Sequence, residues 1–248
     1  MMQRDAPAAA REVLADIAGE LGKLFTALQP VARGFAHIVG LSRHVEREDL
    51  TDLRGVISDV LASQAGLVAG AGVITAPHLL VDAPYWMEWW WAVPDKEPEA
   101  LRVNLEPSAP DFFDYTSADW FVTPQRSGKR HIAGPYVDYV CTNEYTMTLA
   151  LPVAVRDEFV GVVGIDVTIS GWERRILPKL QSLPEPMTLT NAAGRVIAST
   201  SAFLSPGQRL DLAGIAAADT DTGEENAPSS AFGWRLVTDA DALRAFAS

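Results

Sequence analysis

Four tryptophans and one carboxylate lie together in the segment PYWMEWWWAVP, residues 84–94. On a β-strand, side chains alternate between the two faces, so Trp86, Glu88 and Trp90 share one face. Indole faces attract cations by about 0.5–2 kcal/mol, and a carboxylate between two indoles adds a partner for the charge. This face therefore has cation-binding chemistry. The sequence leaves open which face points inward, because a shift of one residue reverses it; we favour Trp86 and Trp90 at the pocket.

A search for catalytic motifs finds no nucleotide fingerprint, G-x-S-x-G elbow or H-E-x-x-H motif. The four histidines are scattered along the chain: His37, His44, His78 and His131. The single cysteine, Cys141, excludes an intramolecular disulfide and a Cys-based metal site, and its surroundings favour a small buried side chain. Paired carboxylates that folding brings together stay open as an acid and a base. We predict a non-enzyme without a cofactor or a metal.

The composition limits the partners that we expect. The 248 residues carry a formal net charge of -12, and such an acidic surface repels phosphate backbones. The densest basic cluster, residues 126–131, is short and has the composition of a solvated loop. Acidic residues interrupt the N-terminal segment, and glycines and Pro77 break the most apolar segment, residues 67–81, which is shorter than the ~18 residues of a spanning helix. We expect a cytoplasmic protein without nucleic-acid or membrane partners.

The elements that must position these residues follow from the hydrophobic pattern. Apolar residues recur at helical spacing over residues 13–28, which predicts a long amphipathic helix that ends or kinks at Pro30. A second helix is predicted over residues 50–64, and the segment between the two is also expected to be helical. From Gly66 onward, β-branched and aromatic residues between glycines and prolines are typical of strands.

Two hairpins and a short helix complete the predicted organisation. YTMTLALPVAV and FVGVVGIDVTI flank residues 156–158 as an antiparallel hairpin, and PMTLTNAAGRVIAST forms another around residues 191–194. GWERRILPKLQSL between them is predicted to be a helix, and AADTDTGEENAPSS a mobile loop. The fold class is α+β with antiparallel sheets. The predicted parts are an N-terminal helical region (1–48), a ligand-binding module (49–170) and a smaller module (171–248).

One long stretch resembles a known family. It contains the pair Trp120-Phe121, the motif GPYVD at residues 134–138, a strand around Pro152, and GVVGID at residues 161–166. In this order and spacing it resembles the double Cache sensor domains, the extracellular ligand-binding modules of bacterial chemoreceptors and histidine kinases. The resemblance implies a long N-terminal helix followed by two PAS-like modules, the first of which binds a small molecule.

The family's amino-acid-binding branch implies roles for single residues. By resemblance, Tyr136, Asp138 and Asp166 stand where that branch holds the ligand's amino group. Phe121 stands where a tyrosine is usual, and Ala118 stands where the branch has the arginine that binds the ligand carboxylate. A buried carboxylate needs a charge-assisted partner, so unless Arg126 or Lys129 folds back, α-amino acids lose their anchor. The expected ligand is therefore a cationic amine, and an amino acid is less favoured.

The predicted ligand-binding residues combine the aromatic wall with the residues implied by the resemblance. They are Trp86, Glu88, Trp90, Phe113, Tyr115, Trp120, Phe121, Tyr136, Asp138 and Asp166. Structural roles compete for some of them: core packing beneath the site is favoured for Trp120, and Asp166 is as compatible with capping a turn as with binding a ligand.

Three functions stay open. The first is a sensor that passes its signal to a separate effector or regulator protein, with a possible homodimer through the N-terminal helix. The second is an enzyme acting on a small amine in the same pocket, with Asp138 and Asp166 as acid and base. The third is an adaptor that exposes the tryptophan-rich segment as a protein-binding surface. We favour the sensor.

Overall fold

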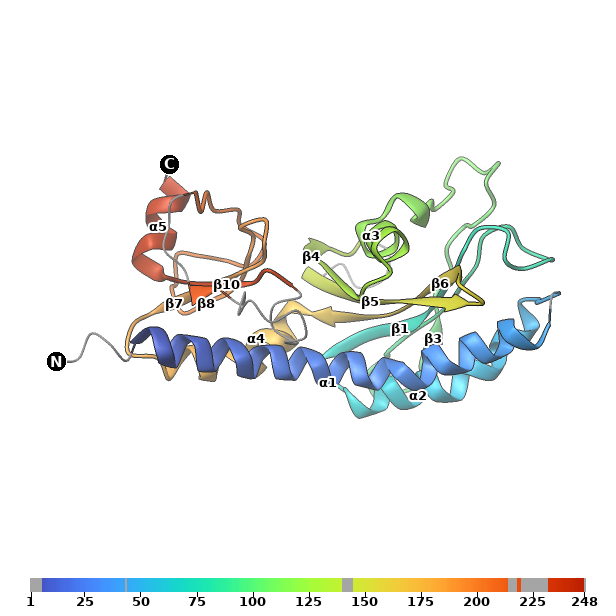
Figure 1. Ribbon diagram of the computed structural model, residues 1–248, viewed down its shortest axis with the longest axis horizontal. Coiled ribbons are helices and arrows are strands. Elements are labelled where there is room, and N and C mark those ends of the chain that lie inside the picture. The colour runs from blue at the N-terminus through green and yellow to red at the C-terminus, as the bar shows by residue number, and fades with distance from the viewer. Residues whose placement is uncertain (1–5, 43, 140–144, 214–217, 220–231, 248) are drawn as a thin grey trace. The chain divides into compact units, whose positions relative to one another are not determined.

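The chain folds as two compact units, each built around a β-sheet (Figure 1). The computed structural model describes residues 6–42, 44–139, 145–213, 218–219 and 232–247. One unit, here called the central unit, comprises residues 25–133 and 138–168. The other contains both chain ends and is called the terminal unit; it comprises residues 1–24, 134–137 and 169–248.

The central unit holds a six-stranded sheet in the order β3-β2-β1-β6-β5-β4. Its strands are β1 (Val68–Thr75), β2 (Met87–Trp91), β3 (Glu99–Ala100), β4 (His131–Val137), β5 (Tyr145–Val155) and β6 (Glu158–Thr168). Helix α2 (Arg54–Ser63), which follows the 3-10 turn η1 (Glu48–Leu53), lies against β1 and β2. Helix α3 (Asp119–Ser127), which follows the short turn η2 (Tyr115–Ser117), lies against β5 and β6 on the opposite face (Figure 1).

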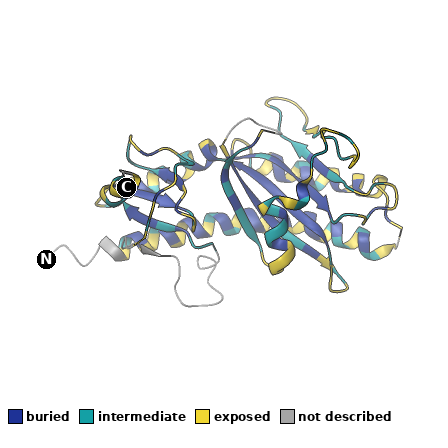
Figure 2. Cartoon of the chain, turned by 90° about the horizontal axis from the view of Figure 1, so that it is seen from above, coloured by how far each residue is buried: buried dark blue, intermediate teal, exposed yellow. Residues whose placement is uncertain are grey.

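The β5–β6 hairpin lies between β1 and β4 in this sheet. Arg156 and Asp157 connect the strands with φ angles of 54° and 64°, and two consecutive positive φ angles match the twist of a tight hairpin. Both strands are buried along most of their length, because helices cover both faces of the sheet (Figure 2). The hairpin predicted around residues 156–158 is confirmed.

Helix α1 (Ala6–Leu41) is 36 residues long and continues through Pro30, where we expected an end or a kink. A stripe of apolar residues at helical spacing is buried within the chain: Leu14, Ile17, Leu21, Leu24 and Leu28. The helix belongs to the terminal unit up to Leu24 and to the central unit from Phe25 onward, so residues 1–48 do not stand apart as a separate region. None of the helices in the described ranges has the length and apolarity needed to cross a bilayer.

The terminal unit holds a smaller, four-stranded sheet in the order β8-β7-β10-β9. Its elements are α4 (Ile169–Gln181), β7 (Met187–Thr190), β8 (Val196–Ser199), β9 (Ala218–Asp219), β10 (Arg235–Thr238) and α5 (Asp239–Ala247). The hairpin predicted around residues 191–194 is confirmed by the β7–β8 pairing. The C-terminal tail forms a helix, and the loop predicted over residues 217–230 lies outside the described residues except for β9.

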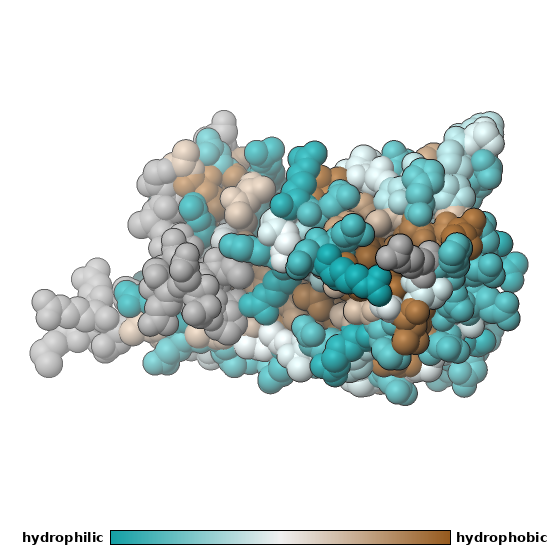
Figure 3. Space-filling view, turned by 45° about the vertical axis from the view of Figure 1, so that its right-hand side comes forward, coloured by the Kyte–Doolittle hydropathy of each residue, from teal (hydrophilic) through white to brown (hydrophobic). Residues whose placement is uncertain are grey.

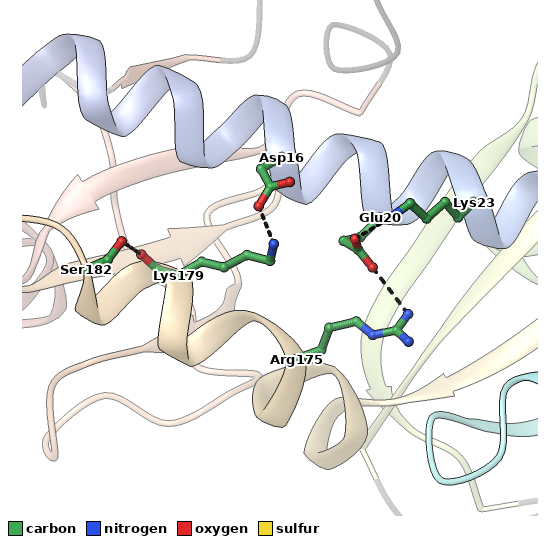
Figure 4. A network of polar contacts seen from close by, with 6 residues as sticks. All are labelled: Asp16, Glu20, Lys23, Arg175, Lys179 and Ser182. Atoms are coloured by element: carbon green, nitrogen blue, oxygen red, sulfur yellow. Dashed lines mark hydrogen bonds and ion pairs between the residues drawn. The ribbon is translucent and has the colours of Figure 1, made fainter.

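Ion pairs connect α1 and α4 within the terminal unit (Figure 4). Asp16 pairs with Lys179, and the carboxylate of Glu20 pairs with Arg175 at 3.4 Å and with Lys23 at 2.7 Å. Most of these side chains are partly exposed, so each pair stabilises the unit by only about 0–1 kcal/mol. The buried stripe of α1 therefore contributes more to holding the helix than these charges do.

Candidate ligand-binding site

The α3-facing side of the central sheet divides into an apolar part and a polar part. The apolar part is one buried cluster formed by Ile74, Trp89, Tyr115, Phe121 and Val162. Val162, Gly164 and Asp166 alternate along β6 and therefore share this side of the sheet. The side chains change from apolar to polar along this strand, so a carboxylate lies on the same surface as the aromatic cluster.

Asp166 and Thr148 form the polar part. They are directly paired across β5 and β6, and the Thr148 Oγ1 donates a hydrogen bond of 2.6 Å to the Asp166 Oδ1. Asp166 is only 6% exposed. Burial raises the pKa of its carboxyl to about 7, the Thr148 hydrogen bond opposes this rise, and the charge of Asp138 adds to it. Asp166 therefore changes its charge near neutral pH.

Asp138 is the second buried carboxylate in this region. It follows β4 directly and is 7% exposed. Its charge and the burial of Asp166 both make ionisation of Asp166 unfavourable. A cation bound beside them relieves this repulsion, so the pair has the electrostatics of an ammonium site.

Trp89 lies on the same side of the sheet and was not among the predicted site residues. A Cβ atom on Gly70 would lie 2.6 Å from the Trp89 Nε1, and a Cβ on Gly164 would lie 3.4 Å from the far edge of the indole. The ring therefore lies flat over these two glycines. Its Nε1 is buried and finds no acceptor among the described residues.

Tyr115 and Phe121 are buried in the aromatic cluster. The Tyr115 hydroxyl donates to the Thr75 carbonyl at 2.9 Å and accepts from the backbone N–H of Trp86 at 3.3 Å. Burial raises the pKa of the Tyr115 hydroxyl. Phe121 packs against Tyr115 at 5.2 Å between ring centroids. Both side chains hold η2 and α3 to the sheet, and the Tyr115 hydroxyl is occupied by the backbone.

Phe113 and Trp120 are half-buried and pack on the same cluster. Trp120 meets Phe121 edge-on, with 6.4 Å between ring centroids, in keeping with the packing role that we favoured for it. Tyr136 lies on β4 and is half-buried. The structure thus brings most of the predicted residues from Phe113 onward to the sheet and α3. Asp138 and Asp166 are the charged residues among them.

Glu88 and Trp90 on β2, and Trp86 directly before it, lie on the opposite side of the sheet, which faces α2. Glu88 is 7% exposed and accepts hydrogen bonds from the Trp90 Nε1 at 2.8 Å and from the Trp86 Nε1 at 3.3 Å. The guanidinium of Arg54, at the start of α2, lies 4.3 Å from the Trp90 ring centroid. Burial raises the pKa of Glu88, while the two indole hydrogen bonds and Arg54 oppose the rise.

The structure therefore places Trp86, Glu88 and Trp90 on the face of the sheet opposite to Asp166. The cation-binding chemistry predicted for this face is present, but the cations are the protein's own. Arg54 covers Trp90, and Arg47 lies 5.2 Å from the Trp86 ring centroid while it pairs with Asp82 at 2.7 Å. The physical reason is the register of β2, which places the even-numbered side chains toward the helices and Trp89 toward the site.

Neither Arg126 nor Lys129 folds back to replace the missing arginine. Ala118 caps the start of α3 and offers no charge. Arg126 and Lys129, at the far end of α3, are both exposed. A ligand carboxylate thus gains no charge-assisted partner from these three positions.

Two residues of the candidate site escaped the sequence analysis, namely Trp89 and Thr148. The signal for Trp89 was the glycine at two positions of adjoining strands, Gly70 and Gly164, because side-chain-free positions leave room for a large ring. Thr148 lies opposite Asp166 only because the pairing of β5 and β6 shifts by one residue between Val153 and Ala154, so the position of the turn alone does not identify it.

The tryptophan-rich segment is not an exposed surface. Its four tryptophans are buried or half-buried. The exposed large apolar residues among the described ones lie elsewhere: Leu41, Val81, Tyr139, Tyr145, Phe203 and Phe246. The view in Figure 3 shows apolar side chains in small groups between hydrophilic ones. These observations do not favour the adaptor.

Within the described ranges no group of three His, Cys, Asp or Glu side chains is placed to hold a metal, and Cys141 lies outside them.

Comparisons with known proteins agree with this architecture. Residues 99–172 match the family described as methyl-accepting chemotaxis protein-like, first PDC sensor domain. No curated protein matches the chain significantly. Among solved structures, methyl-accepting chemotaxis protein X is similar with a TM-score of 0.62 at 16% identity, covering 94% of each chain.

Two ligand complexes are also similar in fold. The ligand-binding domain of the Pseudomonas fluorescens chemoreceptor CtaA, in complex with L-valine, gives a TM-score of 0.60 at 14% identity and covers 93% of each chain. The ligand-binding domain of the Pseudomonas aeruginosa amino acid chemoreceptor PctC, in complex with GABA, gives 0.57 at 14% identity and covers 94% of this chain and 96% of that one. All three are described as chemotaxis proteins or as ligand-binding domains of chemoreceptors.

The long helix and the two units with antiparallel sheets are the architecture that the chain shares with these solved structures. Residues 99–172 are similar to the PDC sensor family, and the chain shares the fold of chemoreceptor ligand-binding domains. The fold predicted from the sequence, α+β with a long N-terminal helix and antiparallel PAS-like sheets, is confirmed.

Proposed function

We propose that the chain is a small-molecule sensor that binds a cationic amine at Asp166 and Asp138. One observation carries the proposal: the buried Asp166 carboxylate accepts a hydrogen bond from Thr148 but pairs with no basic side chain among the described residues. An unpaired buried charge is unfavourable. An ammonium group supplies the opposite charge together with N–H donors, which form the stronger class of hydrogen bond.

The missing arginine decides between amines and amino acids. The amino group of an amino acid meets the same two aspartates, and the CtaA and PctC complexes show that similar folds hold L-valine and GABA. The carboxylate of an amino acid, however, needs a positive partner, and Ala118 supplies none. Beside Asp138 and Asp166, an unpaired ligand carboxylate is also repelled. We therefore place amines without a carboxylate ahead of amino acids.

A thermal-shift screen with matched compounds tests the proposal. Propylamine carries only the ammonium group, butyrate only the carboxylate, and GABA both. Ligand binding to the folded state raises the melting temperature, and the rise grows with ligand concentration over Kd. We expect propylamine to stabilise the protein at pH 8 more than GABA does, and butyrate to leave it unchanged. Stabilisation by butyrate without any effect of amines would reject the proposal.

The signalling partner and the assembly of the sensor stay predictions from the sequence. We propose a separate effector protein that reads the ligand-bound state, and a cytoplasmic location. A homodimer through α1 has to use its polar face, because the apolar stripe is buried within the chain. Light scattering with and without propylamine measures this, and a strict monomer under both conditions removes the dimer.

A further inference from the structure

The Trp89 indole is held flat against the sheet by the absence of side chains beneath it. Gly70 on β1 and Gly164 on β6 lie under the ring, and a Cβ on either would approach it at 2.6 Å or 3.4 Å. Trp89 itself is 4% exposed. The position of its N–H is therefore fixed by packing and does not depend on a hydrogen bond.

The Nε1 donor of this ring has no acceptor among the described residues. Burying a donor without a partner costs about 1–3 kcal/mol, and such a group in a folded protein calls for an explanation. Trp172 in the terminal unit has a similar unpartnered Nε1, but its ring packs edge-on against Trp234 at 6.2 Å. Trp172 thus offers a matched control for an indole N–H without an acceptor.

The location of the Trp89 Nε1 donor distinguishes it from the Nε1 of Trp172. The Nε1 lies over Gly70, and Gly70 is the residue that pairs with Asp166 across β1 and β6. Side chains at directly paired positions have Cβ atoms about 4.5–5.5 Å apart. A neutral donor and a buried carboxylate are therefore neighbours on one surface, within reach of a single small molecule.

We propose that the Trp89 N–H is a ligand-recognition donor, which with Asp166 selects small amines that carry an uncharged oxygen acceptor. The inference rests on the proposed function, since the ammonium group of the same molecule occupies Asp166. An indole N–H carries no formal charge, so it satisfies a hydroxyl, ether or amide oxygen without having to compensate a carboxylate. The ligand class is that of the amino alcohols and amino amides.

A pair of probes separates this donor from the rest of the site. 2-Aminoethanol carries a hydroxyl where propylamine carries a methyl group, and both carry the ammonium. A net hydrogen bond corresponds to a roughly two- to tenfold difference in Kd. By titration calorimetry at pH 8, we expect the full chain to prefer 2-aminoethanol by this factor. Trp89→Phe should bring the ratio close to one, and Trp172→Phe should keep it.

The outcomes separate the two proposals. Equal binding of both amines by the unmodified chain overturns the role of Trp89 and leaves the ammonium site standing. Equal loss of both amines in Trp89→Phe shows that the ring only packs, which also overturns it. Binding of neither amine to the unmodified chain overturns both proposals.

A second measurement does not depend on the variant folding. In a nitrogen-labelled sample the seven tryptophans give indole N–H resonances. We expect 2-aminoethanol to move one of them downfield and propylamine not to. Identical spectra with the two amines would contradict the inference.

Discussion

Thr148 on β5 and Asp166 on β6 face each other across the sheet, and the threonine hydroxyl donates to the aspartate carboxylate at 2.6 Å. This one hydrogen bond does not compensate the burial of the carboxylate, since the pKa of Asp166 still rises to about 7. On the proposed function, this carboxylate lowers the stability of the free protein and pairs with the cation of the ligand. Functional sites commonly carry such a cost.

The first prediction concerns the stability of the protein without a ligand. The folded-state pKa of Asp166 is raised from 3.8 to about 7, so the folded state holds this proton more tightly than the unfolded state. The contribution of Asp166 to stability is therefore fully present below about pH 4 and is lost as the pH rises to about 7. Asp166→Asn removes this dependence, so the melting temperature of the variant relative to the unmodified chain should rise between pH 5 and pH 8. A difference that stays constant over this range would contradict the pKa shift.

The second prediction concerns the affinity for amines. An ammonium group pairs with the ionised form of Asp166, so binding should weaken as the pH falls below about 7, approaching tenfold per pH unit. Proton release on binding of 2-aminoethanol is measurable by calorimetry in buffers of different ionisation enthalpy, near pH 6. Affinity that is independent of pH between 5 and 8 would place the ammonium elsewhere.

The third prediction tests the close packing of the Trp89 ring on Gly70. In Gly70→Ala the new Cβ would lie 2.6 Å from the indole Nε1, so the ring has to move. Overpacking of this kind costs about 1–3 kcal/mol, and we expect weaker binding of 2-aminoethanol as well. Gly55→Ala is the control: Gly55 lies on α2 in the same unit with nothing near its Cβ position, and alanine should stabilise that helix by up to about 1 kcal/mol. Chemical denaturation measures both, and equal effects would refute the close contact.

The fourth prediction distinguishes the two faces of β2. Glu88→Gln weakens the network that joins the Trp86 and Trp90 indoles and Arg54, and should destabilise the protein by about 1–3 kcal/mol. Because this network faces α2, the Kd for 2-aminoethanol should stay within about twofold of that of the unmodified chain. A large loss of affinity in a folded Glu88→Gln protein would show that Trp86, Glu88 and Trp90 take part in ligand binding.

The sequence pattern predicts elements of this fold better than it predicts their register or continuity. The β5–β6 hairpin is marked by two apolar strands around Arg156 and Asp157. The pairing at this turn, if continued without interruption, would place Met147 opposite Asp166; a register shift between Val153 and Ala154 brings Thr148 there instead, and the sequence pattern does not show this shift. The amphipathic pattern of α1 likewise identifies the helix. It does not show that the helix continues through Pro30, because the missing N–H there is offset by packing along the whole element.

The face of β2 was not predictable from its own residues. Both faces carry tryptophan, since both faces of the sheet are covered by helices, and alternation alone cannot assign them. The information lies on other strands: glycines at 70 and 164 accommodate Trp89, and Arg54 on α2 meets Trp90. Both contacts join residues far apart in the chain, so they become visible only in the folded structure.

Titration calorimetry of the Asp166→Asn protein with propylamine and 2-aminoethanol at pH 8 tests the central claim most directly. Its matched control is Asp239→Asn, since Asp239 is a 7% exposed carboxylate in the terminal unit that accepts hydroxyl hydrogen bonds from Thr188 at 2.5 Å and Thr200 at 3.0 Å. The account predicts binding to the unmodified chain and to Asp239→Asn, and a loss of at least about tenfold in Asp166→Asn, because a neutral amide cannot pair with the ammonium. Unchanged affinity in Asp166→Asn would contradict it.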